Sequence, residues 1–236
     1  MESGIDFEEQ YFNPFGNLAK FYYGTNLHRH LRRVQTKQAP GNFEYISVNT
    51  DLLGWVLERA TKKSVPTLLE QRVWQPFGAE HDASWSIDSK RHGVPKYSYG
   101  LNLRSSDLLH LGRLYLHGGT TNDHRIVSRE WIDRMDRMDP EKEYQPNYKN
   151  HWWRDVELRD TYSADEDAML LNTYESIGED GEVETFYRVY SGKYYAAGFL
   201  GQFVYVCPER ETVIVRTGKR QGKTDWIGLF RTIAYQ

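Results

Sequence analysis

The segment Tyr45-Ile-Ser47 leads almost directly into Asn49-Thr-Asp-Leu-Leu-Gly-Trp-Val-Leu-Glu-Arg-Ala-Thr61, and this stretch decides how the chain is interpreted. Apolar residues recur in it at spacings of three and four, which predicts one apolar stripe along a helix over residues 50–61. The stripe comprises Leu52, Leu53, Val56, Leu57 and Ala60. Asn49 or Thr50 is expected to cap this helix. The stretch therefore predicts a loop that enters an amphipathic helix.

Helix signals dominate the first part of the chain and strand signals the last part. Capping residues predict helices that begin near Asn26, Ser64, Ser105 or Ser106, and Ser128, and a closing helix over 225–235. Alternating patterns predict strands over 83–87, 187–190, 194–199, 202–206 and 212–217. Residues 1–40 are otherwise expected to be irregular, and 141–186 to form a long polar excursion. Helices followed by an antiparallel sheet indicate an α/β (α+β) fold.

The composition is that of a globular protein with a sizeable core. The 236 residues are 39% hydrophobic and 14% aromatic, with a net charge of -3. The absence of a basic surplus argues against nucleic-acid binding, and no apolar run is long enough for a membrane span. The first residues do not have the pattern of a signal peptide. A single cysteine, Cys207, excludes an internal disulfide and is expected to be a small buried hydrophobe.

Two generic motifs are weak. Gly218-Lys-Arg-Gln-Gly-Lys-Thr224 has three residues between its first glycine and Gly-Lys-Thr, whereas a phosphate-binding loop needs four. A basic turn between a strand and a helix is the simpler interpretation. The histidine pairs 28/30 and 110/117 match no zinc pattern, so neither a metal nor an organic cofactor is expected.

Tyr45-x-Ser47 and the Leu-Leu-Gly phrase that follows it resemble the second motif of serine hydrolases with the β-lactamase/penicillin-binding-protein fold. The similarity is greatest to the class C β-lactamase-related branch, which includes esterases and 6-aminohexanoate-dimer (nylon-oligomer) hydrolases. Further pieces resemble the family in the same order along the chain. They are Ser3-Gly-Ile5 with Phe7, Glu9 and Tyr11, then Trp74-x-Pro-x-Gly78, Asp107 to Gly112, Tyr195 to Gln202, and Val213 to Arg216.

The resemblance covers nearly the whole chain except 160–186. It implies a single partial domain over 1–236, with a helical part over about 1–140, a polar insertion over about 155–186, and a sheet and closing helix over about 187–236. The implied fold is β-lactamase/transpeptidase-like, with an antiparallel sheet flanked by helices.

One departure from the family pattern is large. The family's nucleophile is the serine of Ser-x-x-Lys, and no serine of this chain has lysine three residues later. In family order that motif belongs upstream of Met1, where any signal peptide would also lie, so no compartment is assigned. Lys-Thr/Ser-Gly is absent too, although the nylon-hydrolase branch resembles this chain in having a Gly-x-x-Gly-Gln strand. The expected fold thus lacks the N-terminal strands and the nucleophile helix.

The resemblance also implies site residues. Tyr45 would be the tyrosine that shares the serine proton with the family's lysine, Ser47 would join the same network, and the Phe199 N–H would donate to the oxyanion. Without that lysine, we expect the pKa of Tyr45 to stay high. The substrate-binding residues would be Tyr148, Trp152, Trp153, Gly198, Gly201 and Gln202. The alternatives are an ordinary strand-to-helix loop for Tyr45 and Ser47, and ordinary packing for the aromatic residues.

Two functions remain open at this point. In the first, the chain would be the C-terminal part of a serine hydrolase that cleaves a small amide or ester through an acyl-enzyme, and it would be inactive alone. Alternatively, it is a non-catalytic binding or regulatory module that retains the pocket. The substrate and oligomeric state are not assigned. In the family fold the N-terminal strands pair with the last strand of the sheet, so their absence would leave the strand over 213–216 as an exposed edge.

Overall fold

The computed structural model describes all residues except 12, 123, 140–144, 164–168 and 179–180. The chain divides into two compact units, and each is described by itself. Unit 1 comprises Met1–Gln75 and Ala79–Arg104, and unit 2 comprises Pro76–Gly78 and Ser105–Gln236.

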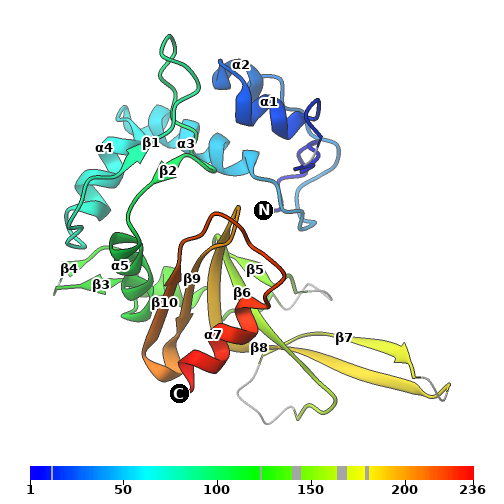
Figure 1. The fold of residues 1–236 in the computed structure, drawn as a ribbon. Coiled ribbons are helices and arrows are strands. Elements are labelled where there is room, and N and C mark those ends of the chain that lie inside the picture. Colours follow the sequence, from blue (N-terminus) through cyan, green and yellow to red (C-terminus); the bar gives the residue numbers. More distant parts are fainter. Residues whose placement is uncertain (12, 123, 140–144, 164–168, 179–180) are drawn as a thin grey trace. The chain divides into compact units, whose positions relative to one another are not determined.

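Unit 1 is mainly helical. Its elements are α1 (Asn17–Tyr23), α2 (Leu27–Leu31), α3 (Val48–Thr61), α4 (Val65–Leu69), a π-helical turn (Glu70–Trp74), and the strand pair β1 (Ser84–Trp85) and β2 (Leu101–Asn102) (Figure 1). The core of this unit gathers side chains from the N-terminal segment, α1, α2 and the start of α3. Its buried members are Ile5, Phe7, Leu18, Phe21, Leu27, Leu31, Ile46, Val48 and Val94.

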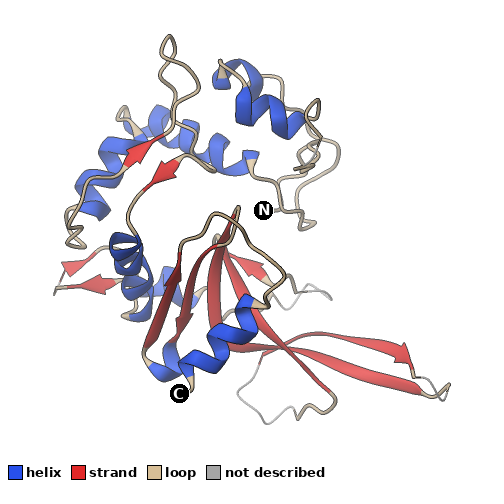
Figure 2. Ribbon diagram, in the orientation of Figure 1, coloured by secondary structure: helices blue, strands red, loops and turns tan. Residues whose placement is uncertain are grey.

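Unit 2 is built on an antiparallel sheet. Its strands are β5 (Tyr148–Lys149), β6 (Trp152–Arg159), β7 (Met169–Ile177), β8 (Val183–Gly198), β9 (Gln202–Cys207) and β10 (Thr212–Arg216). Their order is β10-β9-β8-β6-β5, with β7 paired to β8. The strands are labelled in Figure 1 and drawn in red in Figure 2. The helices are α5 (Ser105–Leu116), α6 (Arg129–Asp133) and α7 (Trp226–Ala234), and β3 (Thr120–Thr121) pairs with β4 (His124–Arg125).

Strand β9 shows how the sheet is covered on both faces. Val204 and Val206 pack with side chains of α5, whereas Phe203 and Tyr205 pack with Phe230 of α7. This follows from the two-residue period of a strand, which sends successive side chains to opposite faces. The fully buried thiol of Cys207 lies on the α7 side, as its sequence context predicted.

The caps predicted at Asn26, Ser64 and Ser128 are confirmed, whereas the cap predicted at Asn49 or Thr50 is wrong, because both residues lie within α3, which begins after Ser47. Asn26, Ser64 and Ser128 each accept a hydrogen bond from the backbone N–H three residues later, at 2.9, 3.2 and 3.2 Å. Asp225 does the same for Gly228 at 3.0 Å and so fixes the start of α7. These contacts are local, which is why the sequence reveals them.

The expected polar excursion over 141–186 is wrong for the residues that the structure describes. Strands β5, β6 and β7 and the start of β8 lie within it. Strand β6 includes Arg154 and Asp155, which are both 1% exposed. The charges are tolerated because Arg154 donates to the carbonyl oxygens of Met135 and Arg137, and Asp155 accepts from Arg231. A polar sequence thus forms a central strand.

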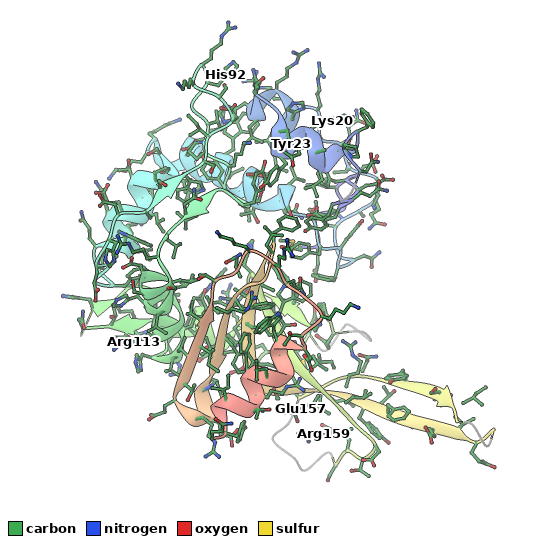
Figure 3. All side chains as sticks on the ribbon, viewed as in Figure 1. Lys20, Tyr23, His92, Arg113, Glu157 and Arg159 are labelled. Carbon is green, nitrogen blue, oxygen red and sulfur yellow. The ribbon has the colours of Figure 1, made fainter. Side chains whose placement is uncertain are left out.

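The two strands expected over 187–190 and 194–199 are one strand, β8. It continues through Gly192, whose φ of 77° lies in the left-handed region. The register with β6 shifts at this point, between Arg154 and Val156. Glycine is the residue that adopts such a conformation without strain, so the chain can pass through an irregularity instead of a turn. Near this irregularity, Glu157 of β6 pairs with Arg159 at 3.0 Å and with Lys193 of β8 at 3.1 Å. Figure 3 labels Glu157 and Arg159.

Two expectations for unit 1 also need correction. Helix α1 lies within the segment expected to be irregular, because the breakers Pro14 and Gly16 precede it rather than interrupt it. Helix α3 is present, but it begins after Ser47, and Leu53, Val56 and Leu57 of the expected inward stripe are exposed. The buried face instead carries Asp51 and Gly54.

The other face of α3 is buried because Tyr97 and Ser98 lie against it. A Cβ on Gly54 would come within 2.2 Å of the Tyr97 ring, so only glycine permits this approach. One turn earlier, Asp51 accepts hydrogen bonds from the backbone N–H of Ser98 at 3.2 Å and from its hydroxyl at 2.7 Å. Specific contacts from a distant segment therefore override the apolar pattern.

Candidate active site

Tyr45 and Ser47 lie on the segment that enters α3, as the sequence predicted. They alternate with Ile46 and Val48, which are each 1% exposed and anchor the segment in the core of unit 1. Ile46 and Val48 are buried while Tyr45 and Ser47 are only partly so, although Ser47 already has helical dihedral angles at the start of α3.

The Ser47 side chain and backbone are held by one carboxylate. Glu9 accepts a hydrogen bond from the Ser47 hydroxyl through Oε1 and from the Ser47 backbone N–H through Oε2 at 3.1 Å. The segment that carries Glu9 is fixed in turn by Ile5 and Phe7, which are buried in the same core. The Tyr11 hydroxyl donates to Glu9 Oε1 at 3.1 Å, so the carboxylate has three donors.

The electrostatics of this group keep protons on the phenols. Burial, followed by the negative charge of Glu9, raises the pKa of Tyr45 above its usual range, while a hydrogen bond with Ser47 opposes the shift. Partial burial and the adjacent Glu9 raise the pKa of Tyr11 to about 12. This direction agrees with the expectation that the pKa of Tyr45 stays high in this chain.

Glu9 and Tyr11 were not predicted as site residues from the sequence. They have the same two-residue spacing as Tyr45 and Ser47, but nothing local indicates that the two segments meet. The contact joins residues 38 positions apart. The two pairs form the unit 1 cluster, which is Glu9, Tyr11, Tyr45 and Ser47.

The remaining predicted site residues lie in unit 2, around the turn between β8 and β9. Gly198 and Gln202 are a cross-strand pair, and Phe199, Leu200 and Gly201 form the turn between them. Phe199 therefore lies just beyond the strand in which it was expected, and its side chain is 58% exposed. Leu200 and Gly201 have φ values of 64° and 84°, which close the turn tightly.

Gln202 has clear structural partners. Its amide donates to the carbonyl oxygens of Gly218 and Phe199, the latter at 3.2 Å, and accepts from the Gly218 N–H at 3.0 Å. Arg216 donates to the carbonyl oxygen of Gly201 and lies 3.8 Å from the centre of the Trp226 ring. These contacts attach the start of the segment 218–224, which is one residue too short for a phosphate-binding loop, to the β8–β9 turn. This agrees with the interpretation of residues 218–224 as a turn.

The three aromatic residues expected to line the pocket have different surroundings. Trp152 is 3% exposed and packs on Tyr115 and Tyr194, with ring centres 4.6 and 5.3 Å away. Tyr148 is 7% exposed and lies edge-to-face with the partly buried Trp153 at 4.7 Å. The surroundings of Trp152 are those of ordinary aromatic packing, the alternative to a substrate-binding role.

Unit 2 also has an open cavity of about 350 Å³ beside α6 and the irregular part of β8. Its lining includes Arg129, Asp136 and Lys193, but none of the predicted site residues. In the part of the chain that the structure describes, no three His, Cys, Asp or Glu side chains are grouped as a metal site would require. None of the described helices has the length and apolarity that a membrane crossing needs.

A model of the Beta-lactamase family matches residues 1–235. The chain belongs to this family. The resemblance to β-lactamase-related serine hydrolases that the motifs indicated is therefore confirmed, as is the fold class.

Relatives within the family agree with this assignment. The chain is 26% identical over 146 residues to the 6-aminohexanoate-dimer hydrolase of Paenarthrobacter ureafaciens, an alignment that covers 57% of this chain and 37% of that enzyme. Because the chain spans well under two thirds of this relative, the activity of the whole protein is treated below as a proposal.

Two solved structures share the fold. One, from Bacillus anthracis and provisionally described as a 6-aminohexanoate-dimer hydrolase, has a TM-score of 0.70 at 19% identity and covers 100% of this chain and 57% of its own. Another, from Bacteroides dorei DSM 17855 and provisionally described as a β-lactamase, has a TM-score of 0.53 at 15% identity, covering 86% of this chain and 62% of its own.

Proposed function

We propose that this chain is the C-terminal part of a serine hydrolase that cleaves a small amide or ester through an acyl-enzyme. One observation carries the proposal. The family match extends over residues 1–235 and includes Tyr45-x-Ser47 at the entrance to α3, yet no serine of the 236 residues is followed by lysine at the third position. The nucleophile would come from polypeptide outside these residues.

In this proposal Tyr45 transfers protons. A serine hydroxyl needs a positioned base to attack a carbonyl carbon at neutral pH. A phenol can serve only when a neighbouring cation stabilises the phenolate, and in this chain burial and Glu9 raise the pKa of Tyr45 instead. The lysine of an added Ser-x-x-Lys segment would supply the cation. Ser47 would then pass a proton toward the leaving group.

The resemblance implies further roles for residues of unit 2. The Phe199 N–H would donate to the oxyanion, as the resemblance implies, and donors aimed at developing charge are a large part of such catalysis. Gly198 and Gly201 would let substrate approach the backbone, with Tyr148 and Trp153 as apolar contacts and Gln202 fixing the turn. The substrate class is amide or ester, and no cofactor takes part.

Substitutions in a protein that contains the proposed Ser-x-x-Lys segment test these roles. With a nitrophenyl ester as substrate, Tyr45→Phe should lower kcat by about 10²-fold or more, the range for loss of a general acid–base group, and Ser47→Ala by less. Tyr174→Phe and Ser176→Ala on exposed β7 are matched controls with the same spacing and should keep full activity. Unchanged kcat in Tyr45→Phe would refute the proposed role.

The alternative is a non-catalytic binding module, and the absence of Ser-x-x-Lys from these residues is the observation that favours it. The coding sequence immediately upstream distinguishes the two. A Ser-x-x-Lys in frame there supports the hydrolase, whereas its absence supports the binding module.

A further inference from the structure

Glu9 has a larger part in the unit 1 cluster than the sequence motifs assign to it. Both of its carboxylate oxygens contact the same residue, since Oε1 accepts from the Ser47 hydroxyl and Oε2 accepts from the Ser47 backbone N–H at 3.1 Å. Contact at two points fixes the side-chain rotamer of Ser47 as well as the position of its backbone. Hydrogen bonds to a charged acceptor are also stronger than those between neutral groups.

The hydrogen bond from the Ser47 hydroxyl to Glu9 uses the one proton that this hydroxyl can donate. A serine hydroxyl has one proton to donate and can accept through its lone pairs. In this structure that proton is donated to Glu9, so Glu9 sets the orientation of the Ser47 hydroxyl.

We infer that Glu9 is a positioning residue of the proposed hydrolase, whose carboxylate holds the hydroxyl and the backbone N–H of Ser47 and so fixes the Ser47 side chain beside Tyr45. The inference rests on the proposed function for its part in the reaction. Glu9 does not touch the reacting atoms. It acts through Ser47, by fixing the side-chain rotamer from which Ser47 takes part in proton transfer.

The charges around Tyr45 support this assignment. The groups that act on the Tyr45 phenol include Glu9, whose negative charge raises its pKa, and Ser47, whose hydrogen bond lowers it. Lys37 and Glu44, on the preceding part of the chain, pair with each other at 2.8 Å. Glu9 is thus the carboxylate that raises the pKa of Tyr45, after burial.

The first experiment uses the 236-residue chain and needs no catalysis. The amide resonance of Ser47 is followed by NMR while carboxylates are protonated in acid. A hydrogen bond to Glu9 should make this resonance move with pH in the native chain and in Glu8→Gln, but not in Glu9→Gln. Glu8 is the matched control because it is the exposed neighbouring acid. A Ser47 amide that responds equally in all three proteins would overturn the inference.

The second measurement is the titration of Tyr45 in the same three proteins. Fluorotyrosine in place of tyrosine lowers every phenol pKa, which keeps the titration within the range where the fold persists, and Tyr45→Phe assigns the signal. We expect a lower pKa for Tyr45 in Glu9→Gln than in the native chain, and no change in Glu8→Gln. A pKa that is unchanged or raised in Glu9→Gln would contradict the inference.

The third measurement uses the protein with the Ser-x-x-Lys segment. Glu9→Gln should lower kcat about tenfold with little change in KM, and should shift the Tyr45-dependent limb of the pH profile to lower pH. In a protein that already carries Ser47→Ala, Glu9→Gln should have almost no further effect on kcat, because Glu9 acts through the Ser47 hydroxyl and that hydroxyl is absent. Additive losses would overturn the inference.

Failure of the proposed function gives a different pattern. If the extended protein is inactive toward all esters and amides while the NMR response of Ser47 is intact, the hydrolase proposal fails. The role of Glu9 in the reaction then fails with it.

Discussion

Arg231 of α7 holds the buried carboxylate of Asp155 on β6, through Nε at 2.9 Å and through Nη2. Asp155 is 1% exposed, and its other partner is the Tyr205 hydroxyl at 2.8 Å. Hydrogen bonding to Asp155, together with the charge of that carboxylate, raises the pKa of Arg231 above its already high value. The pair joins a helix to a strand 76 residues away in the chain.

Removing the cation should destabilise unit 2. We expect Arg231→Ala to lower the free energy of unfolding by about 2–4 kcal/mol, because it leaves a buried carboxylate without its counter-charge, with a reduction for the partial exposure of Arg231. Urea unfolding measures the change. Arg129→Ala, which breaks the exposed pair with Asp133, is the control and should cost about 0.5 kcal/mol or less. Equal losses in the two variants would contradict this account.

Asp51 should make the stability of unit 1 depend on pH. Burial raises its pKa from 3.8 to about 6, although hydrogen bonds from Ser98 oppose the shift. Because the folded-state pKa lies above the unfolded one, Asp51 contributes stability that is complete below the unfolded value and is lost as the pH rises through 6.

The variant Asp51→Asn isolates this contribution. Its stability relative to the native chain should increase by about 3 kcal/mol between acid and neutral pH. The side-chain amide can still bond both groups of Ser98. Chemical unfolding at several pH values measures the difference, and Asp82→Asn, at an exposed position, controls for the loss of one carboxylate. A difference that does not vary with pH would refute the assignment.

Gly112 allows α5 to lie against the sheet. A Cβ at this position would come within 2.4 Å of Val213 Cγ1 and 3.0 Å of Val204 Cγ1. Gly112→Ala should therefore cost about 1–3 kcal/mol of stability through overpacking. In the double variant with Val213→Ala the cost should be less than the sum of the two single changes, because the smaller residue provides space. Strict additivity in urea unfolding would contradict this prediction.

Among the described strands, β10 pairs with β9 alone and so lies at the edge of the sheet. This agrees with the prediction of an exposed edge strand over 213–216. Amide hydrogen exchange should show alternate amides of 212–216 exchanging fast in a monomer, while those of β9 are slow. An edge of this kind is a liability for aggregation. The same amides should be protected in a protein that contains the Ser-x-x-Lys segment. Full protection of all of them in the isolated monomer would contradict this expectation.

The sequence predicted what depends on neighbours along the chain. Caps such as Asn26 and Ser128 act over three residues, and the strand pattern of β9 repeats every two. Tyr45 and Ser47 were found because they directly precede a recognisable helix.

Features that depend on distant partners were missed. Strand β6 was hidden by Arg154 and Asp155, whose burial is possible only because other segments satisfy their charges. The buried face of α3 depends on the approach of Tyr97 to Gly54. Glu9 was missed as a site residue for the same reason, since its contact with Ser47 forms only when the segments meet.

Labelling with a serine-directed phosphonate probe, read by mass spectrometry, tests the central claim most directly. The 236-residue chain should take no label and should show no turnover of a nitrophenyl ester. A protein extended by its in-frame upstream sequence should be labelled at one serine, the serine of an added Ser-x-x-Lys. Covalent labelling of any serine within the 236 residues would contradict the account.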